Sequence, residues 1–243
     1  PADVTEGSLV RLDKDGRPAA ACPLKHTDVN ANISGFLARV TVTQEFENSS
    51  PDAIEAVYRF PLPNDAAVDD MEMLIGKRLV KGVIKKKEDA RKIYEDAKNS
   101  GRTAALLDQE RPNIFTQSVA NIMPGEKIKI TIRYVETMKY EEGTYEFTFP
   151  MVVGPRYTPA SMTDPGQVTV NRTPQGTRAG HDINVKVNLD AGMSLNQITS
   201  PSHSVDVLKA DANRALIALK NSAEIPNKDF ILRYDVGGAK IKD

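Results

Sequence analysis

The sequence predicts a mainly β protein, an antiparallel β-sandwich with one amphipathic helix, and three observations support this fold class. Apolar and polar residues alternate along many short runs, such as 36–46 and 128–134, which is typical of strands with one buried and one hydrated face. Turn-forming pairs such as Asp15-Gly16 and Glu142-Gly143 lie where hairpin loops are expected. A single segment has a helical period, whereas an α/β fold would need several helical crossovers.

The predicted strands follow one another at short intervals. Alternation predicts strands within 36–46, 56–60, 71–75, 114–122, 128–134, 145–149, 183–189, 205–207, 215–219 and 230–236. In the first run, Phe36, Ala38 and Val40 are expected to share the buried face. Further turns are expected at Gly76 and Gly125, and 103–107 fits either a helical turn or a short strand.

The predicted helix covers about 86–99. Ala90, Ile93, Tyr94 and Ala97 follow the spacing i, i+3, i+4, i+7 and form a narrow apolar stripe. Opposite charges four residues apart lie on the other side, and Gly101 provides a stop signal at the C-terminal end.

Composition changes once along the chain and predicts three parts. Residues 151–180 are rich in proline and glycine and predict a long loop or linker. Residues 1–150 are expected to form the β-sandwich domain. Residues 181–243 are expected to form an additional β-rich segment that packs on the sandwich or extends it.

Composition also excludes several classes of protein. The 243 residues contain 32 Lys and Arg against 33 Asp and Glu, and a net charge of −1 argues against a dedicated nucleic-acid binder. The longest apolar run, 215–219, is far shorter than a bilayer span, so no direct membrane insertion is expected. A single cysteine, Cys22, excludes an internal disulfide and a Cys-rich zinc site.

The residues that could carry chemistry do not form a recognisable motif. His26, His181 and His203 are isolated, so we expect surface or loop histidines, and a metal site only through tertiary assembly. Cys22 lacks the context of a thiol nucleophile and is expected to be a half-buried small residue. The P-loop, dinucleotide and G-x-S-x-G patterns are missing. No catalytic, cofactor-binding or metal-binding residue is therefore predicted, no cofactor is expected, and the binding residues are left open.

A basic cluster precedes the predicted helix. It comprises 85–87, Lys77, Arg78 and Lys81, and it is interleaved with acidic residues such as Asp70 and Glu72. A solvated hairpin and helix end is the favoured interpretation, and the alternative is a surface for an acidic polymer, a phosphate or a partner protein.

Residues 23–150 resemble the VIT domain, the domain named after vault protein and inter-alpha-trypsin inhibitor heavy chains. The resemblance rests on an ordered series of segments: 44–48, 58–63 (Tyr-Arg-Phe-Pro-Leu-Pro), 67–68, 82–84, Ala90, Tyr94, Phe115, 118–121, 124–126, Tyr134 and 149–150. The tract 149–157 is similar to bacterial members. Within 58–63 the two prolines remove ladder donors, so the strand must end or bend there, with Phe60 and Leu62 as its anchors in the core.

The resemblance implies a function. It implies a non-enzymatic protein-interaction or scaffolding module of a cell-surface or secreted adhesion-type protein, placed before a von Willebrand factor A domain that would follow residue 243. The expected partners are that neighbouring domain and a protein or matrix component. The expected location is extracellular or on a bacterial envelope, with the export signal outside these residues. Two alternatives remain: an enzyme whose site assembles from distant loops, and an intracellular module of a large ribonucleoprotein-type assembly.

Overall fold

The computed structural model describes residues 7–63, 65–82, 104–111, 114–151, 182–221 and 229–237. Within these ranges the chain forms strands and turns and contains no helix. The helix predicted at 86–99 and nearly all of the predicted 151–180 linker lie outside the described residues. The fold is mainly β, as the alternation predicts.

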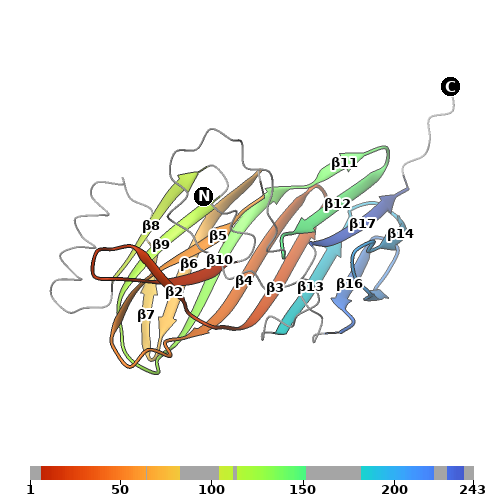
Figure 1. The fold of residues 1–243 in the computed structure, drawn as a ribbon. Helices are drawn as coiled ribbons and strands as arrows, with labels where there is room; N and C mark the ends of the chain where they lie inside the picture. Colours follow the sequence, from red (N-terminus) through yellow and green to blue (C-terminus); the bar gives the residue numbers. More distant parts are fainter. Residues whose placement is uncertain are drawn as a thin grey trace, which may run out of the picture.

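The largest layer is an eight-stranded sheet, which we call sheet B. Its strands, in spatial order, are β15 (Val205–Lys209), β16 (Arg214–Leu219), β13 (Asp182–Asp190), β3 (Leu24–Ser34), β4 (Leu37–Glu47), β10 (Lys127–Thr137), β6 (Ala66–Ile75) and β7 (Arg78–Lys81). Figure 1 shows most of them side by side across the molecule, from β7 on the left to β16 on the right. Neighbouring strands are antiparallel except β3 and β13, which are parallel.

Two smaller sheets complete the fold. Sheet A contains β2 (Pro18–Ala21), β1 (Ser8–Leu12), β5 (Ile54–Pro61), β9 (Ile114–Ile122) and β8 (Ala104–Arg111). Sheet C contains β11 (Lys139–Glu141), β12 (Thr144–Phe149), β17 (Phe230–Val236) and β14 (Leu195–Thr199). Sheet A lies on the side of β6, β10 and β4, and sheet C lies on the side of β13 and β16 (Figure 1).

The core fills the space between the inner face of sheet B and the two smaller sheets. On the sheet A side, the rings of Phe46 and Tyr58 pack edge to face with their centroids 6.0 Å apart. The centroids of Phe60 and Tyr134 lie 6.3 Å apart. On the sheet C side, the Tyr234 hydroxyl donates a hydrogen bond to the main-chain oxygen of Gly35, at 3.2 Å. The buried apolar side chains of all three sheets form one continuous cluster, which is the usual basis of a sandwich.

The local predictions can be compared with these elements. The predicted turns join successive strands, and Gly125 and Gly143 have φ of 72° and 91°, a conformation that glycine adopts without strain. The ambiguous segment 103–107 contributes strand β8. Phe60 and Leu62 are buried on either side of the bend, as predicted. Phe36 was predicted on the buried face but is 57% exposed, because it lies in the turn between β3 and β4 and the inward-facing residues begin at Ala38.

The segment after residue 181 shares sheets with the first part of the chain. Strand β13 pairs with β3, and β17 pairs with β12 in full register from Thr144↔Asp235 to Phe149↔Phe230. The division of the chain into parts at 150 and 181 stays a prediction, since the described ranges contain little of what lies between.

Candidate interaction surface

Sheet B has one face turned away from the core, which we call the outer face. On β3, β13, β4 and β10, every second side chain points there and is mostly polar. The list comprises His26, Asp28, Asn30, Asn32 and Ser34; Asp182, Asn184, Lys186, Asn188 and Asp190; Arg39, Thr41, Thr43 and Glu45; and Lys129, Thr131, Arg133 and Val135. Their apolar neighbours, such as Val29, Val40 and Ile130, are buried on the other side. The outer face is therefore broad and polar.

Ion pairs and hydroxyl contacts occupy the half of the outer face formed by β4, β10 and β6. Lys129 Nζ lies 2.8 Å from a carboxylate oxygen of Glu45, and Arg133 pairs with Asp70 and, at 3.5 Å, with Glu72. These side chains are partly exposed, so each pair stabilises the fold by about 1 kcal/mol at most. Their charges are nonetheless largely matched within the protein.

The half formed by β3 and β13 carries four amides among charged residues such as Asp28 and Lys186. We call Asn30, Asn32, Asn184 and Asn188 the amide stripe. Asn188 donates to the Asn32 side-chain oxygen at 2.9 Å, and this contact bridges the parallel pair of strands. Amides offer both donors and acceptors, so the stripe is suited to hydrogen bonding with another polar surface.

The histidines differ in their surroundings. His26 lies at the end of the amide stripe, with Nε2 3.0 Å from an Asp28 carboxylate oxygen and 3.4 Å from the Asn184 amide nitrogen. His203 is predicted to lie on the surface or in a loop. It lies in the loop between β14 and β15 but is only 6% exposed, because its ring packs on Phe230 with the ring centroids 5.8 Å apart. His181 lies outside the described residues.

Cys22 is buried in the core cluster. Burial raises the pKa of its thiol to about 11, and Arg11 opposes this only partly. The thiol is therefore neutral at physiological pH, and a neutral thiol is a poor nucleophile. Within the described ranges, no three His, Cys, Asp or Glu side chains gather as metal ligands. In the same ranges, no helix is long and apolar enough to cross a bilayer.

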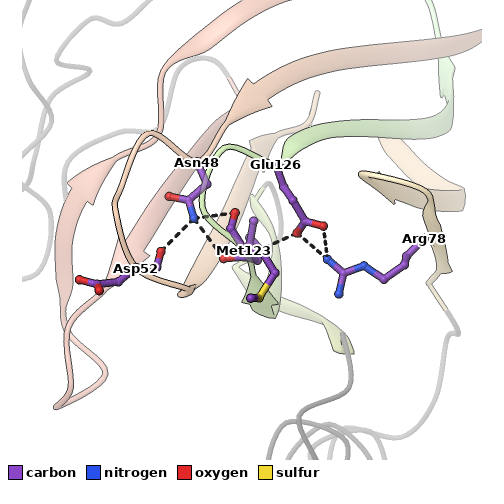
Figure 2. A network of polar contacts seen from close by, with 6 residues as sticks. Asn48, Asp52, Arg78, Met123 and Glu126 are labelled. Atoms are coloured by element: carbon purple, nitrogen blue, oxygen red, sulfur yellow. Dashed lines mark hydrogen bonds and ion pairs between the residues drawn. The ribbon is translucent and has the colours of Figure 1, made fainter.

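Several residues of the motif series make hydrogen bonds that connect loops, and they do not form a reactive centre. Asn48 follows the last residue of β4 and is 1% exposed. Its side-chain nitrogen donates to the main-chain oxygens of Asp52, Ile122 and Met123 at 3.0 to 3.1 Å (Figure 2). Main-chain hydrogen bonds join Asn48 to Glu126 and Gly125 as well. One buried amide thus holds the β4–β5 and β9–β10 loops together.

Glu126 extends this network of contacts, which we call the Asn48 clip, to Arg78 at the start of β7. Its carboxylate accepts a hydrogen bond from the Met123 main-chain nitrogen at 2.8 Å and two from Arg78 Nη2 at 2.6 and 2.5 Å (Figure 2). Arg78 belongs to the predicted basic cluster, so part of that cluster is neutralised within the fold. Residues 85–87 of the cluster lie outside the described residues.

Two buried polar groups lie on β10: Tyr134, which belongs to the predicted alternation, and Glu136, which was not anticipated. Glu136 is 6% exposed and Tyr134 is fully buried, and neither Glu136 Oε1 nor the Tyr134 hydroxyl has a hydrogen-bond partner in the described part of the chain. Burial, and then the nearby charge of Asp65, raises the pKa of Glu136 to about 8. The alternation of β10 could have predicted the burial of Glu136, because Glu136 continues the inward-facing series Ile128, Ile130, Ile132 and Tyr134.

The described residues form a mainly β sandwich with a broad polar sheet face, in which Asn48 and Glu126 of the motif series make structural contacts. Residues 24–134 match the family model described as the vault protein inter-alpha-trypsin domain. This match confirms the resemblance to the VIT domain that the sequence indicates.

Several relatives share part or all of the chain. It is 29% identical over 238 residues to mouse protein mono-ADP-ribosyltransferase PARP4, which covers 98% of this chain and 12% of that protein. It is 36% identical over 138 residues to human von Willebrand factor A domain-containing protein 5A, covering 56% of this chain and 18% of that protein. It is 31% identical over 133 residues to bovine inter-alpha-trypsin inhibitor heavy chain H3, and the alignment covers 54% of this chain and 15% of that protein. The chain thus spans less than a fifth of each.

A solved structure shares the fold over nearly the whole chain. It belongs to a Legionella pneumophila protein provisionally called nutrient-binding, with a TM-score of 0.52, 10% identity, and coverage of 96% of this chain and 72% of the other. At that identity the likeness concerns the fold alone.

Proposed function

We propose that the chain is a non-enzymatic protein-interaction module that orients a neighbouring von Willebrand factor A domain in a longer protein. The observation that carries the proposal is the outer face of sheet B, a broad polar surface with its charges largely matched on one half and an amide stripe on the other. Such a surface suits contact with another folded domain, where many hydrogen bonds form over a wide area.

The relatives support the same proposal. One is named for its von Willebrand factor A domain, and the inter-alpha-trypsin inhibitor heavy chains give the domain family part of its name. The chain covers a small share of each, so a module that works within a larger protein fits their lengths.

The experiment uses the A domain of the longer protein, supplied as a separate polypeptide. Isothermal titration calorimetry should detect binding to the chain, and Asn32→Arg with Asn188→Arg should weaken it at least about tenfold, since two charges would lie unpaired in the contact. Glu141→Arg is the matched control, because Glu141 is highly exposed on β11 of sheet C. A longer protein without an A domain would refute the proposal, as would an A domain that binds both variants equally.

We further propose an adhesion-type role at a cell surface or outside the cell, with a protein or matrix partner. The support is the similarity to the heavy chains of the inter-alpha-trypsin inhibitor. Fractionation of cells that express the full protein tests this, and recovery from the cytoplasm alone would contradict it.

The similarity to PARP4 favours a second candidate, a non-catalytic accessory segment of a multidomain ADP-ribosyltransferase. That alignment covers 98% of the chain, including β13 to β17, whereas the alignment to protein 5A covers 56%. Assay of the longer protein for mono-ADP-ribosylation distinguishes the two candidates, since only the second requires a transferase domain elsewhere in it.

A further inference from the structure

Sheet B has an open edge at β15. In the described part of the chain, no strand pairs with the outer side of β15, which lies beyond β16 at the end of the sheet opposite β7. Residues 206–209 are all exposed, and Leu208 is 66% exposed. An edge strand of this kind presents main-chain donors and acceptors to a further strand.

The hydrogen bonds to β16 show which main-chain groups point outward. The Ala210 nitrogen donates to the Arg214 oxygen at 2.9 Å, and the Lys220 nitrogen donates to the Ser204 oxygen at 3.0 Å. Bonded positions alternate along an antiparallel pair, so the even-numbered residues of β15 bond to β16. The N–H and C=O groups directed at the open edge are therefore those of Val205, Val207 and Lys209.

The side chains at this edge include an apolar pair on the outer face, as do those at the opposite edge, where Leu74 faces Leu79. Leu208 lies directly opposite Leu216 of β16, and the two are 66% and 42% exposed. Val207, which points to the inner side, is 40% exposed. Natural edge strands are usually protected by charges, prolines or bulges. Strand β15 contains Asp206 and Lys209 but neither a proline nor a bulge, and its exposed leucine pair beside free main-chain groups indicates a strand that another strand covers.

Other sheet edges in the described ranges are better protected. Strand β11 has three residues, two of them charged, and β2 begins with Pro18 and has an irregular register. The edge of β14 is capped, because Lys209 Nζ donates to the main-chain oxygens of Leu195 and Asn196 at 3.2 and 3.4 Å. Residues of β7 contact β8 of sheet A. Strand β15 is thus the most available edge.

We propose that β15 pairs with β15 of a second copy of this chain, antiparallel, about a two-fold axis at Leu208. The sequence of the strand selects this register. An axis at Asp206 would place two carboxylates opposite each other, and an axis at Val207 would place Asp206 opposite Leu208. With the axis at Leu208, the leucines of both copies form one row, Leu216–Leu208–Leu208–Leu216, and Val207 meets Lys209 of the other copy through their outward main-chain groups.

This pairing joins two eight-stranded sheets into one continuous sheet. The contact is between identical chains, so it is separate from binding of an A domain to the amide stripe, and failure of either leaves the other intact.

Sedimentation velocity of the 243-residue chain over a wide concentration range tests the pairing. The chain should dimerise reversibly. Leu208→Lys should lower the association constant about tenfold or more, since it removes a leucine that the contact buries. Val207→Pro should act similarly, because it removes an outward donor and leaves the bonds to β16 in place. Leu79→Lys is the matched control, since Leu79 is 57% exposed on β7 at the opposite edge and should not affect dimerisation.

A disulfide trap tests the register. In the proposed dimer, Leu208→Cys places two thiols opposite each other across the axis, and mild oxidation should link the copies. Asp206→Cys is the control, because its thiol would lie opposite Ala210 of the other copy and should not link. Cys22 is buried and should contribute no background.

A chain that stays monomeric at every concentration overturns the proposal, including the case in which β15 instead binds a strand of a different protein. A dimer that resists Leu208→Lys also overturns it, because the contact then lies elsewhere. If Val207→Pro loses the far-ultraviolet circular dichroism signal of the folded protein, Leu208→Lys decides alone, since Leu208 is 66% exposed and can be replaced without disturbing the core.

Discussion

Glu136→Gln should stabilise the protein by an amount that grows with pH. Glu136 lies on the inner face of sheet B, opposite Ala38 on one side and Ala66 on the other, and is 6% exposed. Burial first, and Asp65 second, raises its pKa from 4.5 to about 8. A carboxyl group in these surroundings is held protonated at neutral pH, because its charged form would lose hydration without gaining a partner.

The sign and the size follow from the two pKa values. Below pH 4.5 the carboxyl is protonated in both folded and unfolded chains, so it contributes no penalty. Between pH 4.5 and about 8 the unfolded chain releases the proton while the folded protein retains it. Each pH unit in this window lowers the free energy of unfolding by about 1.4 kcal/mol, which amounts to about 3 kcal/mol between pH 5 and pH 7. Glutamine cannot ionise, so the variant escapes this loss.

Urea denaturation of both proteins at pH 5, 6, 7 and 8 measures the effect. The difference in free energy of unfolding, variant minus wild type, should rise steadily over this range. Glu141→Gln is the control and should give a flat difference, since the Glu141 side chain is 73% exposed. A difference for Glu136→Gln that varies by less than about 0.5 kcal/mol from pH 5 to pH 8 would refute the reasoning, because linkage requires the slope.

Three further predictions concern buried groups. Tyr58→Phe should destabilise the protein by about 1 to 3 kcal/mol in urea denaturation, since the Tyr58 hydroxyl donates to Gln44 Oε1 at 2.7 Å. Tyr134→Phe should destabilise it by less than about 0.5 kcal/mol, because the Tyr134 hydroxyl has no partner in the described part of the chain. Equal losses of stability in the two variants would contradict this contrast. Asn48→Ala should cost about 2 to 4 kcal/mol by leaving loop carbonyls unsatisfied, whereas Asn32→Ala on the outer face should cost about 0.5 kcal/mol or less, and a neutral Asn48→Ala would show that the clip is dispensable. Cys22 should react with a thiol reagent at pH 8 only as fast as the protein unfolds, because its pKa is about 11 and it is buried; a fast reaction of the native protein, followed spectrophotometrically, would contradict its burial.

Alternation located most strands because it reports directly on which side chains leave water. It worked for β10 and β13, in which each apolar residue from Ile128 to Tyr134 and from Ile183 to Leu189 is buried. It missed β3, a central strand of sheet B, because Asn30 and Asn32 have low strand propensity and the inward series contains the small Ala31. Hydrogen bonding from strands on both sides maintains β3 despite these residues.

The outer face could not be predicted because it depends on pairing between distant segments. The amide stripe exists since β13 pairs with β3 in parallel, and Asn188 and Asn32 are 156 residues apart in the sequence. No local pattern sets the register of such a pair. The motif series, in contrast, indicated the family, yet it did not predict that Asn48 and Glu126 join two loops to the start of β7.

Glu136 and His203 show the limit of inference from residue type. Both are polar and both are buried, at 6% exposure, although histidine and glutamate are usually assigned to the surface. His203 is compensated by the Ser202 side-chain oxygen, 2.8 Å from its Nδ1, and by the ring of Phe230 on β17. Glu136 Oε1 has no such compensation among the described residues, and its neighbours across the sheet are two alanines. A buried carboxyl that is stable only when protonated lowers the free energy of unfolding above pH 5. Glu136→Gln should therefore give a gain in stability that grows with pH, which replacement of an exposed glutamate should not give.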